Sequence, residues 1–294
     1  MTYSEIWHRI ATSYDDGEAR AIARILIEEL FGLSYTDIVC GATEQLSADD
    51  TLRLDTAVRR IEQGEPLQHV LGYADFCGNR FCVNGSVLIP RPETEWLVDE
   101  GAKLMDGCIA SDETQHKAPH SPKRILDIGT GSGCIAISLK LRLGDAYVEA
   151  WDISEEALRT AQDNADALKA EVVFRKRDAL RADNTAAPWD LIVSNPPYIC
   201  DSERTAMDDN VLLHEPHTAL FVPDDDPLRF YRAIARYALL TLKIGGSLLF
   251  ECNTRYAEAT GTMLSDMGFE EVTVSDDCFN LPRFVRGRKN SHNQ

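Results

Sequence analysis

The sequence has no long hydrophobic run. None of its apolar stretches approaches the roughly 20 residues that a membrane-spanning helix requires, which excludes a protein anchored by such helices. The first residues, 1–5, contain no basic start followed by an apolar segment, so we expect no secretory leader. These absences predict a cytoplasmic protein with no membrane partner.

Paired cysteines are also missing. The eight cysteines are scattered and no two are separated by two residues, and the seven histidines do not group with them in a pattern typical of zinc ligands. The sequence therefore predicts neither a metal site nor a disulfide framework, and reduced thiols are expected.

Positive charge is scarce. The formal net charge is -18 and the pI is about 4.8, which counts against a protein that grips long stretches of phosphate backbone. We therefore expect no stable nucleic acid binding. The composition, with 44% hydrophobic and 27% charged residues, is that of an ordinary soluble protein, and 294 residues suffice for one α/β domain and a smaller one.

The first 72 residues show helical periodicity and predict a small helical bundle. Residues 73–91 show short β-type runs, for which Asn84-Gly85 is the expected hairpin turn and Val87–Ile89 an expected strand, and they predict a β-hairpin linker to a catalytic domain over 92–294. The apolar positions expected to form the helical core are Ile6, Trp7, Ile10, Ile22, Leu26, Leu30, Leu52, Leu54, Val58 and Ile61.

Beyond a polar segment at 111–123, expected to be a surface loop, strands and helices alternate. This alternation predicts a doubly wound, Rossmann-like sheet. Two final strands near 271–274 and 284–286 are expected to form an antiparallel edge. The other expected strands are 124–128, 147–151, 172–174, 191–194 and 247–250, and the expected helices are 134–143, 154–168, 228–242 and 256–267.

A glycine-rich loop follows the first of these strands. Gly129, Gly131 and Gly133 permit a tight turn and a close approach of a ligand to the backbone. The dinucleotide-binding form of this loop would need glycine where Cys134 stands. The observed spacing, preceded by Asp127, is similar to the first motif of S-adenosylmethionine-dependent methyltransferases.

Acidic residues end the next two strands of the predicted sheet. Asp152, about 20 residues after the loop, can accept hydrogen bonds from two ribose hydroxyls, and Asp178 with Ala179 can meet the adenine edge. Each aspartate alone also suits a helix cap. Their joint position beside a glycine loop favours a cofactor site.

The fourth strand leads into Asn195-Pro196-Pro197-Tyr198. Two prolines remove backbone donors, so the Asn195 side-chain carbonyl and the Pro196 carbonyl remain as acceptors beside the flat face of Tyr198. Such a site fits a planar NH2 group, either a carboxamide or the exocyclic amine of adenine. A Pro-Pro turn that merely ends a strand is the alternative interpretation.

Taken together, these motifs resemble the PrmC/HemK family of peptide chain release factor glutamine-N5 methyltransferases. The resemblance runs almost end to end, and the runs at 88–95 and 215–220 are its most specific parts. Cys77 and Ala179 depart from the residues frequent in the family. The matching runs are Glu65-Pro66-Leu67-Gln68-His69, Leu88-Ile89-Pro90-Arg91-Pro92-Glu93-Thr94-Glu95, the 125–133 loop, the 192–199 segment and Glu215-Pro216-His217-Thr218-Ala219-Leu220.

The resemblance implies a class I S-adenosylmethionine-dependent methyltransferase domain. The implied substrate is the glutamine of a Gly-Gly-Gln motif in class I peptide chain release factors, docked partly by the N-terminal helices, and the chain is expected to be a monomer. The implied catalytic and substrate-binding residues are Asn195, Pro196, Pro197 and Tyr198, with Arg91 nearby. The implied cofactor contacts are Asp127, Gly129, Thr130, Gly131, Ser132, Gly133, Asp152, Asp178, Ala179 and Asn195.

Two other functions fit parts of the pattern. An adenine-N6 methyltransferase acting on DNA or RNA would use the same acceptor pair, although the acidic charge disfavours it. A cofactor-binding scaffold without catalysis is disfavoured because every acceptor position is present. Glu251, which ends the strand near 247–250, receives no role from the sequence.

Overall fold

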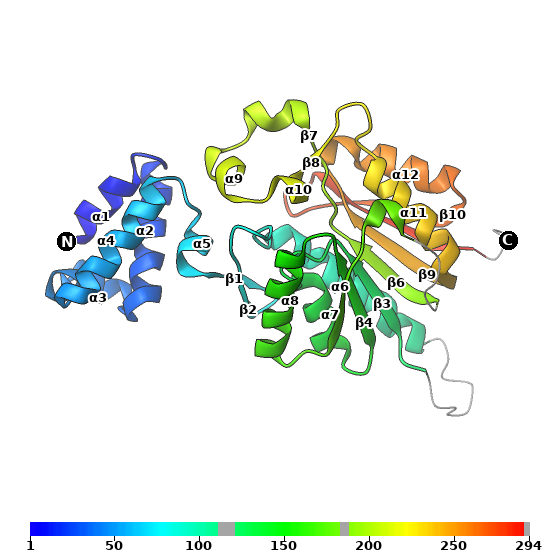
Figure 1. Ribbon diagram of the computed structural model, residues 1–294, viewed down its shortest axis with the longest axis horizontal. Coiled ribbons are helices and arrows are strands. Elements are labelled where there is room, and N and C mark those ends of the chain that lie inside the picture. The colour runs from blue at the N-terminus through cyan, green and yellow to red at the C-terminus, as the bar shows by residue number, and fades with distance from the viewer. Residues whose placement is uncertain (111–120, 183–187, 291–294) are drawn as a thin grey trace. The chain divides into compact units, whose positions relative to one another are not determined.

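The computed structural model describes residues 1–110, 121–182 and 188–290, and the chain divides into two compact units (Figure 1). One unit comprises Met1–Tyr73, Val83–Gly85 and Met207–Glu215, and the other comprises the rest. Most of the loop expected at 111–123 lies outside the described residues. Within the described ranges, no helix combines the length and apolarity that crossing a membrane requires.

The first unit is helical. Its core contains Ile6, Ile10, Leu26, Leu54 and Val58, as their spacing predicts. The helices are α1 (Tyr3–Ile10), α2 (Asp16–Phe31), α3 (Tyr35–Val39), the short 3-10 turn η1 (Ala42–Gln45), α4 (Ala48–Glu62), α5 (Leu67–Leu71) and α9 (Asp209–His214). The four helices α1 to α4 begin at side-chain caps, for which the Ser47 hydroxyl accepting from the Asp50 N–H is an example.

The prediction is wrong for one core residue of this unit. Leu52 is 66% exposed, whereas Leu54, Val58 and Ile61 are fully buried. Two residues along a helix correspond to a rotation of about 200°, so Leu52 and Leu54 face opposite sides of α4.

The expected hairpin exists, but its turn and one of its strands were wrongly predicted. It consists of β1 (Tyr73–Phe76) and β2 (Asn79–Cys82), while 87–89 is not a strand. The turn is Cys77-Gly78, whose φ angles are 47° and 74°. Positive φ at both positions gives the turn a twist that matches the flanking strands. Asn164 holds the hairpin, since its Oδ1 accepts from the Cys82 N–H at 2.6 Å.

A seven-stranded sheet in the order β10-β11-β9-β6-β3-β4-β5 forms the centre of the second unit. The order reverses at β3, so β3 and β6 diverge at the crevice where such sheets bind ligands. β11 is antiparallel to both of its neighbours, β9 and β10, and lies inside the sheet, while β10 forms the edge. The strands are β3 (Arg124–Ile128), β4 (Tyr147–Asp152), β5 (Val172–Lys176), β6 (Trp189–Ser194), β9 (Leu242–Glu251), β10 (Phe269–Asp276) and β11 (Pro282–Lys289).

Both faces of this sheet are covered by helices. Alternate strand residues contribute to two cores: Ile125 and Leu249 belong to one, and Leu126 and Leu248 belong to the other. One face packs against α6 (Glu95–Ala110), α7 (Cys134–Leu143) and α8 (Glu155–Leu168), and the other against α11 (Arg229–Thr241) and α12 (Ala257–Asp266). The remaining short elements are η2 (Pro92–Thr94), η3 (Ala179–Arg181), β7 (Ile199–Cys200), η4 (Asp201–Ala206), α10 (His217–Leu220), β8 (Phe221–Val222) and η5 (Thr254–Tyr256).

Candidate active site

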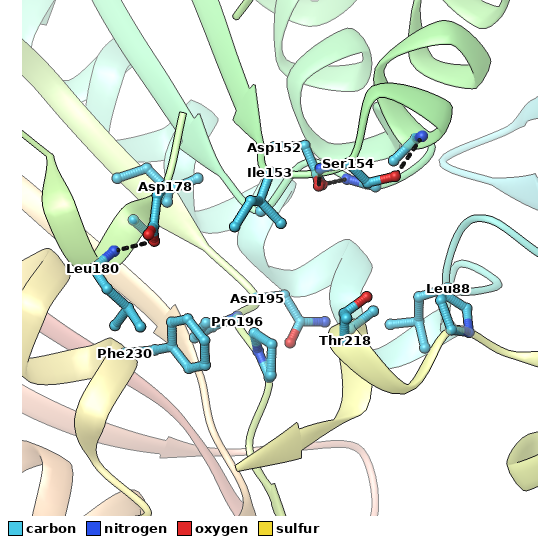
Figure 2. A pocket seen from close by; sticks show the side chains of 18 of the residues that line it. Leu88, Asp152, Ile153, Ser154, Asp178, Leu180, Asn195, Pro196, Thr218 and Phe230 are labelled. Atoms are coloured by element: carbon cyan, nitrogen blue, oxygen red, sulfur yellow. Dashed lines mark hydrogen bonds between the residues drawn. The ribbon is translucent and has the colours of Figure 1, made fainter. Parts of the chain in front are cut away.

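A cavity of about 360 Å³ opens at the carboxyl ends of the central strands. This volume is in the range of small-molecule sites. Figure 2 shows Asp152 facing Asn195 and Pro196 across it, with Asp178, Leu180 and Phe230 toward one end and Leu88 and Thr218 toward the other. Eight of the predicted site residues line it, namely Gly129, Gly131, Asp152, Asp178, Ala179, Asn195, Pro196 and Pro197.

The glycine loop turns tightly between β3 and α7. Its three glycines have φ angles of 78°, 54° and 82°, which only glycine adopts readily. The backbone N–H groups of Gly129 and Thr130 donate to the Trp151 carbonyl at 2.8 and 2.9 Å, so the loop is tied to β4. Gly131 remains open toward the cavity, whereas a Cβ on Gly133 would lie 2.9 Å from Ile137 and 3.1 Å from Ala161.

Gly133→Ala is therefore expected to destabilise the fold. Backbone strain and overpacking together should lower the free energy of unfolding by about 2–4 kcal/mol, measured by urea denaturation. Gly131→Ala is the matched control, because it has a φ of 54° and nothing within 4 Å of the added Cβ. Equal losses in the two variants would show that the contact with Ile137 and Ala161 is unimportant.

Both strand-end aspartates bind backbone N–H groups and also line the cavity, and Asp178 in addition caps η3. Asp152 accepts hydrogen bonds from the Gly131 and Ser154 N–H groups, both at 2.9 Å, and burial raises its pKa. Asp178 accepts from the Leu180 N–H at 2.9 Å. Each carboxylate oxygen has a further lone pair for a ligand hydroxyl or amine, so the capping and binding roles are compatible.

Asp127 lies beneath the glycine loop and does not line the cavity. Its Oδ2 accepts from the Thr130 hydroxyl at 2.6 Å, and among the described residues Oδ1 has no side-chain or backbone partner. Burial raises the pKa of Asp127 to about 7. A buried negative charge beneath the loop favours a positively charged group, such as an ammonium, bound on the other side of the loop.

Cofactor binding is expected to weaken as pH falls through about 7. A nearby cation stabilises ionised Asp127, and protonation below its pKa of about 7 removes that attraction. Binding near neutral pH should therefore release protons, which calorimetry in buffers of different ionisation enthalpy measures. Asp127→Asn should remove most of the dependence. An unchanged dependence would assign it to another group, such as Asp152, whose charge raises the pKa of Asp127.

The Asn195-Pro196-Pro197 turn is fixed next to the glycine loop. Ser194 donates its hydroxyl to the Ile128 carbonyl at 2.6 Å and so ties the end of β6 to the end of β3. Tyr198 is not part of the cavity lining, and its hydroxyl lies 3.3 Å from Glu251 Oε1.

The remaining predicted site residues lie around the cavity lining. Burial and the charge of Glu251 raise the pKa of Tyr198, while the charges of Arg283 and Arg91 lower it. Thr130 and Ser132 are buried in the glycine loop.

Sequence reasoning missed several residues of this region. Thr94 belongs to the 88–95 run and Glu251 ends a strand, but no sequence feature assigns a role to either residue. Phe230 on α11 and Leu180 line the cavity, and no sequence signal marks them.

The lining fits S-adenosyl-L-methionine, the cofactor that the sequence resemblance implies. Carboxylates at Asp152 and Asp178 suit the ribose and adenine polar groups, and Leu180 and Phe230 supply apolar surface for the adenine ring.

Two family models match parts of the chain. Residues 96–220 match the methyltransferase small domain, and residues 8–72 match the PrmC N-terminal domain. In a solved structure, the hMettl16 catalytic domain in complex with an RNA hairpin has a TM-score of 0.52 with 17% identity, covering 83% of this chain and 82% of that one, which shows the fold alone.

Curated relatives cover nearly the whole chain. A release factor glutamine methyltransferase from Bacteroides thetaiotaomicron is 43% identical over 94% of this chain and 95% of its own length. One of the same name from Flavobacterium psychrophilum is 36% identical over 94% of each chain. The chain belongs to the family of release factor glutamine methyltransferases.

Proposed function

We propose that the chain methylates the side-chain amide nitrogen of the glutamine in the Gly-Gly-Gln motif of class I peptide chain release factors, and so supports translation termination. The observation that carries the proposal is the pair of acceptors at Asn195 and Pro196, which line the cavity next to the glycine loop. S-adenosyl-L-methionine is the cofactor and supplies, when bound, an electrophilic methyl group on a sulfonium.

The chain's own residues would act mainly by orientation. An amide nitrogen is a poor nucleophile because its lone pair is delocalised into the carbonyl. If Asn195 Oδ1 and the Pro196 carbonyl accept the two amide hydrogens, the nitrogen is held with its lone pair toward the methyl group. Intramolecular analogues of such positioning lower barriers by up to ~7–11 kcal/mol. No general base is required, since the alkylated nitrogen loses its proton readily.

Tyr198 and Arg91 complete the proposed substrate site. Tyr198 would pack its ring against the substrate amide and interact with developing positive charge. Its position beside the turn and its contact with Glu251 support this assignment. The cofactor would be held by the glycine loop 129–133 with Asp127, Asp152, Asp178 and Ala179. Five of these residues, namely Gly129, Gly131, Asp152, Asp178 and Ala179, are in the cavity wall.

The domain assignment belongs to the same proposal. Residues 1–72 would dock the release factor, 73–91 would form the linker and 92–294 would carry catalysis; the match of 8–72 to the PrmC N-terminal domain supports the first of these. We also propose a monomer that acts in the cytoplasm and does not bind nucleic acid stably, since the net charge is -18.

Adenine-N6 methylation of DNA or RNA is the second candidate, because the same acceptors suit an exocyclic amine. A methylation assay distinguishes the two functions. The chain is incubated with labelled cofactor and with a recombinant class I release factor, unmethylated DNA or unmethylated RNA, each at several salt concentrations. Label on the release factor with weak salt dependence supports the proposal. Label on nucleic acid that falls steeply with salt would favour the alternative, and label on none of these would revive the scaffold interpretation.

A further inference from the structure

A buried carboxylate lies behind the Asn-Pro-Pro turn. Glu251, the last residue of β9, is 1% exposed, and its two oxygens meet different partners. Oε2 accepts from the Thr94 hydroxyl at 2.7 Å, and Oε1 accepts from the Tyr198 hydroxyl at 3.3 Å. One side chain is therefore linked both to Tyr198 and, through Thr94, to the turn itself.

Thr94 connects this carboxylate to Asn195. It is 3% exposed, and Asn195 Nδ2 lies 3.4 Å from its Oγ1. The distance is long for a hydrogen bond, and contacts of this kind often tighten when substrate binds. The link runs Glu251, Thr94, Asn195 in a water-poor environment, where an unpaired polar group is costly.

The chemistry of these groups determines the direction of the hydrogen bonds. Burial raises the pKa of Glu251, while the hydrogen bonds from Thr94 and Tyr198 and the charge of Arg283 favour its ionised form. Above this pKa the carboxylate only accepts, so Thr94 must use its single proton on Glu251. Thr94 can then only accept from Asn195, which must turn its NH2 toward Thr94 and its Oδ1 away from it. The opposite amide rotamer would place two acceptors, Oδ1 and Oγ1, in contact.

We propose that Thr94 and Glu251 are positioning residues that fix the Asn195 amide with Oδ1 directed at the methyl-accepting NH2 group. The inference rests on the proposed function for its substrate, but the amide orientation is a property of the free protein. Without the link, Asn195 presents its NH2 to the substrate in part of the molecules, and two donor groups then face each other. Glu251 holds Tyr198 in the same way, so one carboxylate orders both sides of the amide site.

Thr94→Val tests the proposal, because valine keeps the shape and removes the hydroxyl. It is expected to lower kcat about 10- to 100-fold while leaving the Kd for S-adenosyl-L-methionine within about 3-fold. Thr94→Ser, which retains a hydroxyl, should keep kcat near that of the wild type. Thr241→Val is the matched control, since Thr241 is also buried and donates to the Tyr237 carbonyl of α11.

A double-mutant cycle tests whether Thr94 acts through Asn195. Added to Asn195→Ala, Thr94→Val should lower kcat by less than about 3-fold, because the group that it orients is already absent. The inference would be overturned if the double variant lost activity by the product of the two single losses. It would also be overturned if Thr94→Ser did not keep activity, or if Thr94→Val were as active as Thr241→Val.

An activity-independent measurement separates this inference from the proposed function. In nuclear magnetic resonance spectra of the free protein, the Asn195 side-chain NH2 signals, assigned by their loss in Asn195→Asp, should show slowed hydrogen exchange that Thr94→Val removes. Absence of methylation by the wild type would refute the proposed function alone. Unchanged exchange in Thr94→Val would refute the orientation by Thr94.

Discussion

Asn195→Ala should lower kcat for release factor methylation by about 100-fold or more. The variant removes one of the two acceptors that the proposed mechanism assigns to the substrate amide, and it leaves a hydrogen of a desolvated NH2 unpaired. Asn195 also forms part of the cavity wall, so the Kd for cofactor must be measured beside kcat. A single-turnover assay with saturating cofactor isolates the methyl-transfer step.

Asn290→Ala is a suitable control for that result. Asn290 directly follows β11. Because β11 runs antiparallel to β9, Asn290 lies at the opposite end of the strands from Glu251 and the turn. Its replacement should leave kcat unchanged. Wild-type kcat in Asn195→Ala would contradict the acceptor model, and a loss confined to cofactor affinity would reassign Asn195 to cofactor binding alone.

Asp152→Ala is expected to raise the Kd for S-adenosyl-L-methionine about 100-fold, because hydrogen bonds to charged groups contribute about 1.5–3 kcal/mol each. At saturating cofactor, kcat should stay within about 5-fold of the wild type, since the carboxylate contacts a part of the ligand distant from the transferred methyl. Isothermal titration calorimetry gives the affinity.

Two further measurements serve as controls for the Asp152→Ala result. Asp152 also accepts from the Gly131 and Ser154 N–H groups, so thermal unfolding must show that the loop region survives the change. Asp163→Ala, an exposed aspartate on α8, should leave affinity unchanged. Unaltered affinity in Asp152→Ala would place the ribose elsewhere in the cavity.

The sheet and the motif residues of the cavity could be predicted because their signals are local. Apolar runs that end in Asp152 or Asn195 mark buried parallel strands, and parallel strands bring their carboxyl ends to one edge. Glycines at fixed spacing mark a turn that other residues do not adopt readily. These features depend on neighbouring residues in the chain, so they can be read from the sequence.

The features that could not be predicted from the sequence depend on contacts between distant residues or on competing local signals. Thr94 lies 157 residues from Glu251 and 101 from Asn195, and no periodicity connects them. At the hairpin, Asn84-Gly85 carried the stronger turn signal, but the turn formed at Cys77-Gly78, where Phe76 and Phe81 enter the core. Packing of these two aromatics outweighs local turn preference.

Mapping the position of the methyl group tests the central claim most directly. A class I release factor, methylated by this chain with labelled S-adenosyl-L-methionine, is digested and its peptides are sequenced by tandem mass spectrometry, with a release factor carrying alanine in place of the Gly-Gly-Gln glutamine as the control. We expect one methyl group on the side-chain nitrogen of that glutamine and none on the alanine control. Methylation elsewhere, or equal labelling of the control, would contradict the assignment of the Asn195 and Pro196 acceptors to that glutamine amide.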